Sequence, residues 1–239
     1  IAACNAGKHV YCEKPACHNP QEGEWMVAAA QKHKRVVQVG TQRRSFPAII
    51  EAINLVRGGA LGKVHYSRGW YNNRRPSIGH SVAGNPPAHL DFALWQGPAP
   101  TRPFRDNILH YNWHWFWHWG TGELGNNGVH AIDVCRWGLN VSFPQKVTSA
   151  GQKVRHDDDQ ETPDTHVVNY EFPGGKSITW EGLSWSPRGI EGDSFGMTFH
   201  GTEATMAVTS NGYKIYDLKN KLTSENPGTG GDAAHLAAL

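Results

Sequence analysis

The sequence predicts two structural units: a partial, doubly wound α/β unit over residues 1–62, then a mostly antiparallel, open-sheet α+β unit over residues 63–239. Two observations lead to this prediction. The first stretch alternates short apolar runs with helical patterns, as parallel βαβ units do. The second stretch contains strand-like runs separated by Gly, Pro and Asn turn signals. We expect both ends to be truncated, because a parallel sheet does not start at its middle.

The first unit is predicted to contain two strands and two helices. His9 to Cys12 is a short strand candidate. Asn19 then supplies an N-cap and Pro20 the first helical position, so a helix is expected to reach about His33. Residues 35–40 form a buried-strand pattern. The second helix starts at a proline, ends at a Gly-Gly pair, and carries its apolar residues on one face: Ile49, Ile50, Ile53 and Val56.

The second unit is predicted to be a sheet backed by few helices. Pro-, Gly- and Asn-rich stretches continue to about residue 112, and one amphipathic segment covers residues 125–139. After Asp217 the sequence becomes polar and Gly-rich, and His235–Leu239 resembles the first turns of a helix. The strand-like runs are Thr165–Phe172, Ser177–Trp185, Phe195–His200, Thr205–Thr209 and Tyr213–Tyr216.

Composition excludes several classes of partner. The 23 Lys and Arg residues against 21 Asp and Glu give a net charge of only +2 without a long basic run, so we expect no nucleic-acid partner. No apolar run approaches the about 20 residues of a membrane span, so no membrane partner is expected. Four cysteines are too few for a disulfide scaffold. Ten Trp and 14 His suit pockets for polar, ring-shaped ligands such as sugars.

A Gly-rich motif of the dinucleotide-binding type, G-x-G-x-x-G, occurs at residues 120–125. Its usual role requires a preceding buried strand, a following helix and a later parallel strand. Here the residues before the motif alternate Trp and His, which is not the pattern of a buried strand. The sequence after the helix has the turn signals of antiparallel strands. We therefore expect these glycines to form a tight turn close to a substrate or to the helix start.

Acid–base chemistry is predicted on the helix that follows. Asn126 and His130 are four residues apart, so both side chains can reach one ligand. An imidazole has the pKa range for proton transfer at a sugar hydroxyl, and an amide one turn earlier can hydrogen-bond the same substrate. Asp133, three residues after His130, is expected to orient the ring, to cap nearby backbone or to contact substrate. A buried histidine with a purely structural role is the competing interpretation.

Two polar stretches follow predicted strands. Arg43 and Arg44 should project from a strand's carboxyl end, where open α/β sheets bind ligands. We expect Arg43 to reach substrate or cofactor and the other arginine to be a surface charge. Tyr71, in the run to Arg75, is a weaker substrate-contact candidate, and a solvated loop remains the alternative.

Two histidine-containing runs suggest metal ions. His114 and His118 could converge, but spacing places no third ligand, so a sugar-stacking wall combined with core packing is preferred. The run His156 to Asp159 lacks a Gly-punctuated ligand loop and is interpreted as a solvated turn. No metal site is predicted.

Four stretches resemble one family of sugar-active enzymes, the glucose-fructose oxidoreductase, inositol dehydrogenase and rhizopine-catabolism (Gfo/Idh/MocA) family. They are AGKHVYCEKP at 6–15, VGTQRR at 39–44, LWQGPAPTRPF at 94–104 and GELGNNGVHAIDVCRWGL at 122–139. The resemblance implies that residues 1–62 are the later part of a Rossmann-type dinucleotide-binding domain without its phosphate-binding half. It also implies that residues 63–239 form the substrate and oligomerisation domain.

The resemblance assigns roles to individual residues. It implies that Lys14 lies between nicotinamide and substrate, and that Glu13, Lys14 and Pro15 shape the cofactor pocket. His130 carries over as the catalytic acid or base. The family helix commonly reads Asp-x-Gly-x-His, whereas this chain has Asn126 in the first position, which puts a carboxylate-assisted proton relay in doubt. Lys14 would polarise the reacting oxygen, or carry the proton itself if neighbouring charge lowers its pKa.

The function implied is that of a fragment of an NAD(P)-dependent oxidoreductase acting on a secondary hydroxyl of a sugar, cyclitol or sugar acid. Two alternatives remain open: an NAD-dependent glycosidase of the same family, and a catalytically silent carbohydrate-binding or sheet domain. The parent enzyme would use NAD or NADP, and the fragment alone is expected to lack a competent cofactor site. A homodimer or larger homo-oligomer is expected, with a cytoplasmic location, although a periplasmic parent stays open.

Overall fold

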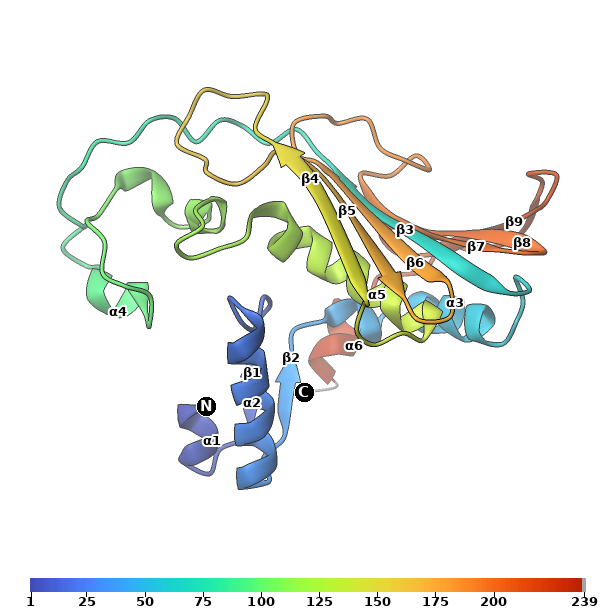
Figure 1. Cartoon of the computed structure of the whole chain (residues 1–239), viewed down its shortest axis with the longest axis horizontal. Helices are drawn as coiled ribbons and strands as arrows, with labels where there is room; N and C mark the ends of the chain where they lie inside the picture. Colours follow the sequence, from blue (N-terminus) through green and yellow to red (C-terminus); the bar gives the residue numbers. More distant parts are fainter. Residues whose placement is uncertain (238–239) are drawn as a thin grey trace.

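A computed structural model of the chain describes residues 1–237 and shows a small N-terminal unit below a large, twisted sheet (Figure 1). The elements up to the large sheet are α1 (Ala2–Asn5), β1 (Val10–Cys12), α2 (Pro20–His33), β2 (Val37–Val39), η1 (Gln42–Ser45) and α3 (Pro47–Arg57). Strands β1 and β2 are parallel, with Val10 opposite Val37. The side chain of Asn19 accepts a 3.0 Å hydrogen bond from the backbone N–H of Glu22, which confirms the expected N-cap.

The second unit is an eight-stranded sheet in the order β10-β9-β8-β7-β3-β6-β5-β4. Every neighbouring pair is antiparallel except β3 and β6, so the predicted mostly antiparallel sheet is confirmed. Its strands are β3 (Val64–Asn72), β4 (Lys146–Gln152), β5 (Thr165–Phe172), β6 (Lys176–Leu183), β7 (Phe195–Gly201), β8 (Ala204–Val208), β9 (Tyr213–Asp217) and β10 (Leu222–Asn226).

The two edge strands were not among the expected runs. Every residue of β4 is exposed, and four of the five residues of β10 are exposed. A strand without a buried face carries no apolar alternation, which is the signal that the sequence analysis used for strands. Their place in the sheet comes from pairing with β5 and β9, not from their own side chains.

One face of the sheet is covered by α3 and by α5 (Val129–Leu139) (Figure 1). Ile49 and Ile53 of α3 share one apolar core with Phe199 of β7 and Trp180 of β6. Gly138 brings α5 close to the sheet, because a Cβ at this position would collide with the Phe199 ring. By its packing, α3 therefore belongs with the large sheet, although the predicted first unit extends to residue 62.

The connection between β3 and α5 contains short helical segments: α4 (Phe92–Gln96), η2 (Asp106–Ile108), η3 (Asn112–Trp115) and η4 (Leu124–Gly128). A separate small core forms here around Ile108, Trp115 and Phe116. Part of the Trp-rich run is thus core, while the Trp117 side chain is half exposed. The segment before α5, expected to be an ordinary helix start, is a π-helical turn.

The last described element is α6 (Asp232–Ala237), which returns to the N-terminal unit. His235 on α6 hydrogen-bonds Tyr11 of β1 at 3.1 Å and Ser45 of η1 at 3.0 Å. The predicted C-terminal helix is therefore present through Ala237, and its last two residues lie outside the described ones. Helix α6 thus lies beside the N-terminal unit.

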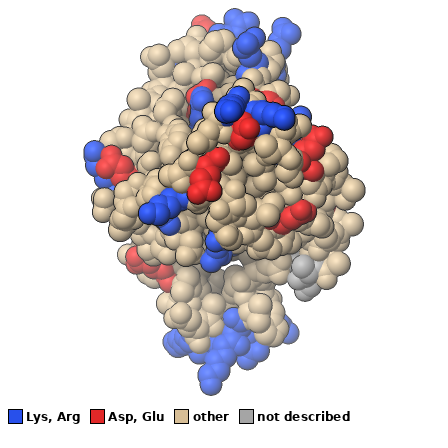
Figure 2. Space-filling view, turned by 90° about the vertical axis from the view of Figure 1, so that its right-hand side faces the viewer, with Lys and Arg blue, Asp and Glu red and all other residues tan. Residues whose placement is uncertain are grey.

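Charge is distributed without a broad basic face in the view of Figure 2. Acidic and basic side chains are interspersed over most of this face. Basic side chains gather at the lower tip of this view, at the height where α2 ends in Figure 1. The last turn of α2 carries Lys32, and Lys34 and Arg35 follow the helix in the sequence. Within residues 1–237, no helix has the length and apolar character needed to cross a bilayer.

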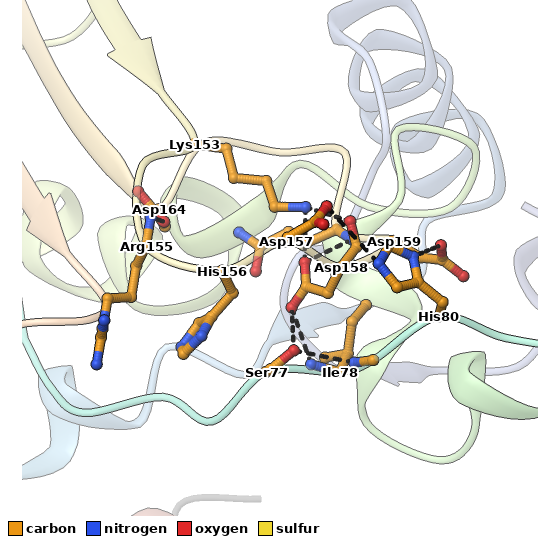
Figure 3. A network of polar contacts seen from close by, with 12 residues as sticks. Ser77, Ile78, His80, Lys153, Arg155, His156, Asp157, Asp158, Asp159 and Asp164 are labelled. Carbon is orange, nitrogen blue, oxygen red and sulfur yellow. Dashed lines mark hydrogen bonds and ion pairs between the residues drawn. The ribbon is translucent and has the colours of Figure 1, made fainter.

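The loop between β4 and β5 corrects one sequence interpretation (Figure 3). The run of acids there was interpreted as a solvated turn, but only Asp157 is solvated: the side chains of Asp158 and Asp159 are 1% and 13% exposed. Asp158 accepts hydrogen bonds from the Ser77 hydroxyl at 2.9 Å and the Ile78 N–H at 3.0 Å. These carboxylates fasten the loop to residues 77–81, so the acids have a structural role.

Substitution of Asp158 by asparagine is expected to lower the free energy of unfolding by about 2 to 3 kcal/mol, because charge-assisted bonds to a buried carboxylate are lost. Asp158 also pairs with Lys153 at 2.6 Å. Burial alone would raise the pKa of Asp158, but the Lys153 ammonium and the donors at Ile78 and Ser77 outweigh it and leave the pKa lowered. The stabilisation is therefore present above the usual aspartate pKa and is lost as pH falls through the lower folded value.

Urea denaturation at neutral pH measures this effect. The matched control is Asp157→Asn, which makes the same change on the adjacent, fully exposed side chain. Equal unfolding free energies for the two variants would show that the Asp158 contacts contribute nothing.

Candidate active site

The site forms where the loop after β1 meets η4. Lys14 follows the carboxyl end of β1, and its Nζ donates hydrogen bonds to the backbone oxygen of Asn126 at 3.1 Å and to the side-chain Oδ1 at 2.9 Å. The Lys14–Pro15 peptide bond is cis. Two residues predicted from the sequence, 112 positions apart, are thus in direct contact. Asn126 holds the lysine, so its side chain is not free to bind substrate alone.

A buried carboxylate behind Asn126 was missed by sequence reasoning. Glu123 is 4% exposed, and its Oε1 accepts hydrogen bonds from the side-chain amides of Asn126, at 3.1 Å, and of Asn127. Glu123 is three residues before Asn126, a spacing that places the two on one helical face. The only sequence signal was an acid within the Gly-rich motif at residues 120–125.

An arginine and two tyrosines surround this carboxylate. Arg75 Nε lies 3.5 Å from Glu123 Oε2, an ion pair without hydrogen-bond geometry. The Arg75 guanidinium lies 5.3 Å from the ring centres of both Tyr71 and Tyr111. Tyr111 also accepts a 3.0 Å hydrogen bond from the Asn126 amide. Tyr71, a predicted substrate contact, is buried and accepts a hydrogen bond from Asn73 at 2.6 Å.

A cavity of about 110 Å³ opens beside the lysine. Its wall combines the loop after β1 with the segment from η3 to η4: Lys14, Pro15, Tyr111, Trp113, His114, Thr121, Gly122, Gly125 and Asn126. Gly122 has a φ of +64°, which favours glycine, and a Cβ there would lie 2.7 Å from Thr162. Gly122 and Gly125 of the Gly-rich motif line the cavity as expected for glycines near a ligand, but the motif runs into the π-helical turn η4 and forms no separate tight turn.

Burial tunes the lysine. The pKa of Lys14 is lowered from its ordinary value, first because burial disfavours the ammonium, and further by the charge of Arg75. The negative charges of Glu123 and Glu13 oppose this lowering. Burial therefore makes the largest contribution to the lowered pKa of Lys14, whereas neighbouring charge was expected to be the cause.

His130 lies on α5 and is 6% exposed. Burial, together with the positive charges of Lys14 and Arg43, lowers its pKa to about 4, so the ring is neutral at neutral pH. Its Nδ1 has no hydrogen-bond partner among the described residues. The ring does not belong to the wall of the 110 Å³ cavity.

Asp133 and the two arginines take positions other than those expected. Asp133 pairs with Arg44 through two hydrogen bonds, at 2.7 and 2.8 Å, so it is the Arg44 guanidinium and not the His130 ring that its carboxylate binds. Arg44, expected to be a plain surface charge, therefore joins η1 to α5. Arg43 bonds the Ser210 carbonyl and lies 4.5 Å from the centre of the Phe195 ring. The positive charge of Arg43 contributes to the lowered pKa of His130.

Glu13 is exposed and turned back toward its own strand. Its carboxylate accepts hydrogen bonds from the Tyr11 hydroxyl at 2.9 Å and from the Lys14 N–H at 3.2 Å. Gly40 at the end of β2 permits this arrangement, because a Cβ there would lie 2.8 Å from the Glu13 carboxylate. Glu13 thus shapes the loop that presents Lys14.

The histidines of the Trp-rich run bond to different carbonyl groups. His114 Nδ1 lies 2.5 Å from the Tyr111 carbonyl oxygen, and His118 Nε2 lies 2.6 Å from that of Pro100. Burial lowers the pKa of His114 to about 4. Within the described part of the chain, no group of three His, Cys, Asp or Glu residues could hold a metal ion.

Comparison with known proteins identifies the family. Residues 93–207 match the model of the GFO/IDH/MocA C-terminal domain, and residues 1–41 match that of the oxidoreductase family with an NAD-binding Rossmann fold. The chain belongs to the Gfo/Idh/MocA family. This confirms the resemblance inferred from the four sequence motifs, and the two family domains occur in the expected order.

Gfo/Idh/MocA relatives with known activities match parts of the chain. Levoglucosan dehydrogenase of Pseudarthrobacter phenanthrenivorans is 28% identical over 137 residues, which cover 57% of this chain and 28% of that protein. Inositol 2-dehydrogenase of Salmonella typhimurium is 36% identical over 64 residues, covering 26% of this chain and 19% of that protein. The chain thus matches well under half the length of these curated relatives.

Solved structures share the fold over nearly the whole chain. The aldose-aldose oxidoreductase of Caulobacter crescentus superimposes with a TM-score of 0.70 at 21% identity. The superposition covers 99% of this chain and 61% of the solved one. At this identity the likeness establishes the two-unit architecture and not the substrate.

Proposed function

We propose that the protein is an NAD(P)-dependent oxidoreductase that oxidises a secondary hydroxyl of a sugar, cyclitol or sugar acid. The observation that carries the proposal is the lysine of the Glu-Lys-Pro motif, held by two hydrogen bonds to Asn126 at the edge of a small cavity. Family membership and the inositol- and sugar-oxidising relatives support the substrate class.

The geometry of Lys14 suits proton transfer. Two of its N–H groups are directed at the two oxygens of Asn126. The remaining position on Nζ is a third N–H in the ammonium and a lone pair in the neutral amine. The neutral amine can therefore accept the hydroxyl proton of the substrate there, and the ammonium can return it in the reverse reaction. A lowered pKa makes the neutral form accessible at a lower pH.

Asn126 and Glu123 position the lysine. An amide oxygen accepts the lysine N–H without adding a negative charge beside it, whereas the family's usual aspartate would stabilise the ammonium more strongly. Glu123 fixes the amide by accepting from its Nδ2, which turns Oδ1 toward Lys14. The Glu123 carboxylate therefore positions Lys14 Nζ through the Asn126 side chain that lies between them.

His130 contributes a neutral ring. Its unpartnered Nδ1 is a buried polar atom for which a substrate or cofactor group can supply the missing hydrogen bond. We assign it to hydrogen bonding with the reacting alcohol, whereas the resemblance to the family implies a catalytic acid or base at this position. Its pKa of about 4 means that this role does not change between pH 6 and 9.

The residues beside the cavity fit the nicotinamide end of NAD(P). Lys14 and Pro15 follow the carboxyl end of a parallel strand, where such sheets bind ligands, and Gly122 and Gly125 also line the cavity. When bound, the nicotinamide supplies the acceptor for the hydride that leaves the carbinol carbon. Lys14 and His130 then act on the oxygen of the same carbinol.

The test combines calorimetric titration of NAD and NADP with an absorbance assay for NADH or NADPH. The full-length protein is supplied with inositols, aldoses and sugar acids. Formation of reduced cofactor from one of these classes is the expected result. Glycoside cleavage without net reduced cofactor would instead favour the glycosidase alternative. Failure of the full-length protein to bind either cofactor would contradict the proposal, whereas binding by residues 1–239 alone would contradict only the expectation that this stretch lacks a competent cofactor site.

We further propose that the protein is a homo-oligomer. Within residues 1–237, both strands of the β1–β2 pair have an unpaired outer edge, and the large sheet ends in the fully exposed strand β4. Unpaired edges favour pairing with another chain. Light scattering at micromolar concentration should therefore give a mass of at least two chains, and a monomer would contradict this proposal.

A further inference from the structure

A second cleft, of about 540 Å³, opens at one end of the large sheet. Its wall is basic and aromatic, and no Asp or Glu belongs to it: Arg74, Arg75, Pro76, Arg155, His156, Trp185 and Pro187. Only Arg75 also belongs to the surroundings of Lys14, through its ion pair with Glu123. The cleft is therefore a separate space that adjoins the candidate active site.

Strand directions bring these residues together. Strand β3 is parallel to β6, and β4 runs in the same direction because β5 is antiparallel to both β4 and β6. The carboxyl ends of β3, β4 and β6 thus lie at the same end of the sheet, at the top of Figure 1. The loops that leave them supply residues 74–76, 155–156 and 185–187 to the cleft.

The cleft has unneutralised positive charge. Arg74 and Arg155 are exposed and form no ion pair within residues 1–237. Figure 3 shows Arg155 and His156 projecting to one side of their loop, away from Asp158 and Asp159. Guanidinium groups that converge on a concave surface without a carboxylate attract an anion and can bind it through paired hydrogen bonds.

Hydrogen bonds hold the wall in place without using these guanidinium groups. The backbone N–H of Arg155 donates to the Asp164 carboxylate at 2.9 Å, and the Arg75 N–H donates to the Ser184 carbonyl at 2.8 Å. His156 Nε2 lies 3.2 Å from the Arg75 carbonyl oxygen. All three loops are therefore fastened to one another or to the sheet, and the side chains of Arg74 and Arg155 remain available to a ligand, while Arg75 is paired with Glu123.

Trp185 adds an aromatic surface to the cleft. Its Nε1 donates to the Thr165 hydroxyl at 2.8 Å, which fixes the ring. A fixed indole face packs well against the apolar face of a sugar ring, while arginines bind its charged substituent. This combination is selective for a ligand that is both a carbohydrate and an anion.

We propose that this cleft binds the acidic group, a carboxylate or a phosphate, of an anionic sugar that is the substrate of the enzyme. The term substrate rests on the proposed oxidoreductase function, whereas binding itself does not. Arg75 provides the physical link, because it belongs to the cleft wall and contacts Glu123, Tyr71 and Tyr111 beside Lys14.

Calorimetric titration of the protein with glucuronate, glucose 6-phosphate and glucose tests the proposal without turnover. At least one anionic sugar is expected to bind about tenfold or more tightly than glucose, because hydrogen bonds to charged groups are lost with the neutral sugar. Tighter binding of glucuronate identifies a carboxylate site, and tighter binding of glucose 6-phosphate a phosphate site. Equal binding of all three sugars, or no binding, overturns the proposal.

The double variant Arg74→Gln/Arg155→Gln removes two exposed charges from the cleft and leaves Arg75 in place. It should remove the preference for the anionic sugar and leave glucose binding unchanged. Arg57→Gln, at the exposed end of α3, is the matched control and should keep the preference. A preference that survives in the double variant, or is lost equally in the control, overturns the proposal.

The two proposals fail independently. Arginine-dependent binding of an anionic sugar without formation of reduced cofactor would leave the cleft assignment intact and contradict the oxidoreductase function. Oxidation of neutral polyols without any preference for anionic sugars would support the oxidoreductase function and contradict the cleft assignment.

Discussion

Replacing Lys14 by methionine should lower kcat/KM for alcohol oxidation by about 10²- to 10⁴-fold, the range for loss of a positioned acid–base group. Methionine keeps much of the length of the side chain but can neither give nor take a proton. Steady-state rates of NADH or NADPH formation measure the effect. The fold should persist, since Lys14 is partly exposed in a loop.

The control for this prediction is Lys8→Met, six residues earlier on an exposed turn. It removes the same charge without touching the cavity and should retain the activity of the unmodified protein. Thermal unfolding of both variants separates a catalytic defect from a folding defect. A Lys14→Met variant that keeps more than about a tenth of the activity would contradict the role assigned to the lysine.

Replacing His130 by glutamine is expected to lower kcat/KM by about 10²-fold, because a polar contact to the reacting alcohol is disturbed within a buried site. Glutamine retains polar atoms of its own but not the imidazole geometry. The rate of the unmodified protein should show no step near pH 6.5, because the His130 ring is already neutral there.

Stability supplies an independent readout for His130. Its pKa is about 4 when folded and 6.5 when unfolded, so the unfolded chain binds the extra proton between these values. The folded state therefore loses stability as pH falls from 6.5 to 4, by on the order of 3 kcal/mol for this residue. Urea titrations across this range should show a shallower loss in His130→Gln. An unchanged slope would show that the ring is not buried in its neutral form.

His114 contributes to the remaining slope in such a variant. Its pKa is also about 4, with burial as the main cause. The two histidines therefore act in the same direction and in the same pH window. Their separate contributions follow from comparing the single variants.

The sequence predicted much of the site, because two features were local. The Glu-Lys-Pro motif located Lys14, and the four-residue spacing of Asn126 and His130 placed both near the start of one helical segment. Glu123 was not found, because its role depends on contacts with Arg75 and, through Asn126, with Lys14. Nothing in the spacing of residues 120–125 reveals such distant partners.

Charge pairing was the least predictable feature. His130 is three residues from Asp133 in the sequence, whereas Arg44 is 89 positions away. The fold nevertheless pairs the Asp133 carboxylate with the Arg44 guanidinium. The acids at 158 and 159 likewise appear solvated as a run and become buried only when residues 77–81 pack over them. Contacts between residues far apart in the sequence determine the partners and the burial of these carboxylates, and such contacts cannot be predicted from the spacing of residues in one sequence.

The pH dependence of kcat/KM in Glu123→Gln most directly tests the claim that Lys14 transfers the proton and that Asn126 and Glu123 set its properties. The negative charge of Glu123 raises the pKa of Lys14 and partly offsets the effect of burial. Oxidation should become faster as pH rises through the pKa of Lys14, which lies below its ordinary value of 10.5. Removing the charge should move this rise to lower pH, whereas an unchanged rise, or one centred near 6.5 in both proteins, would contradict the account.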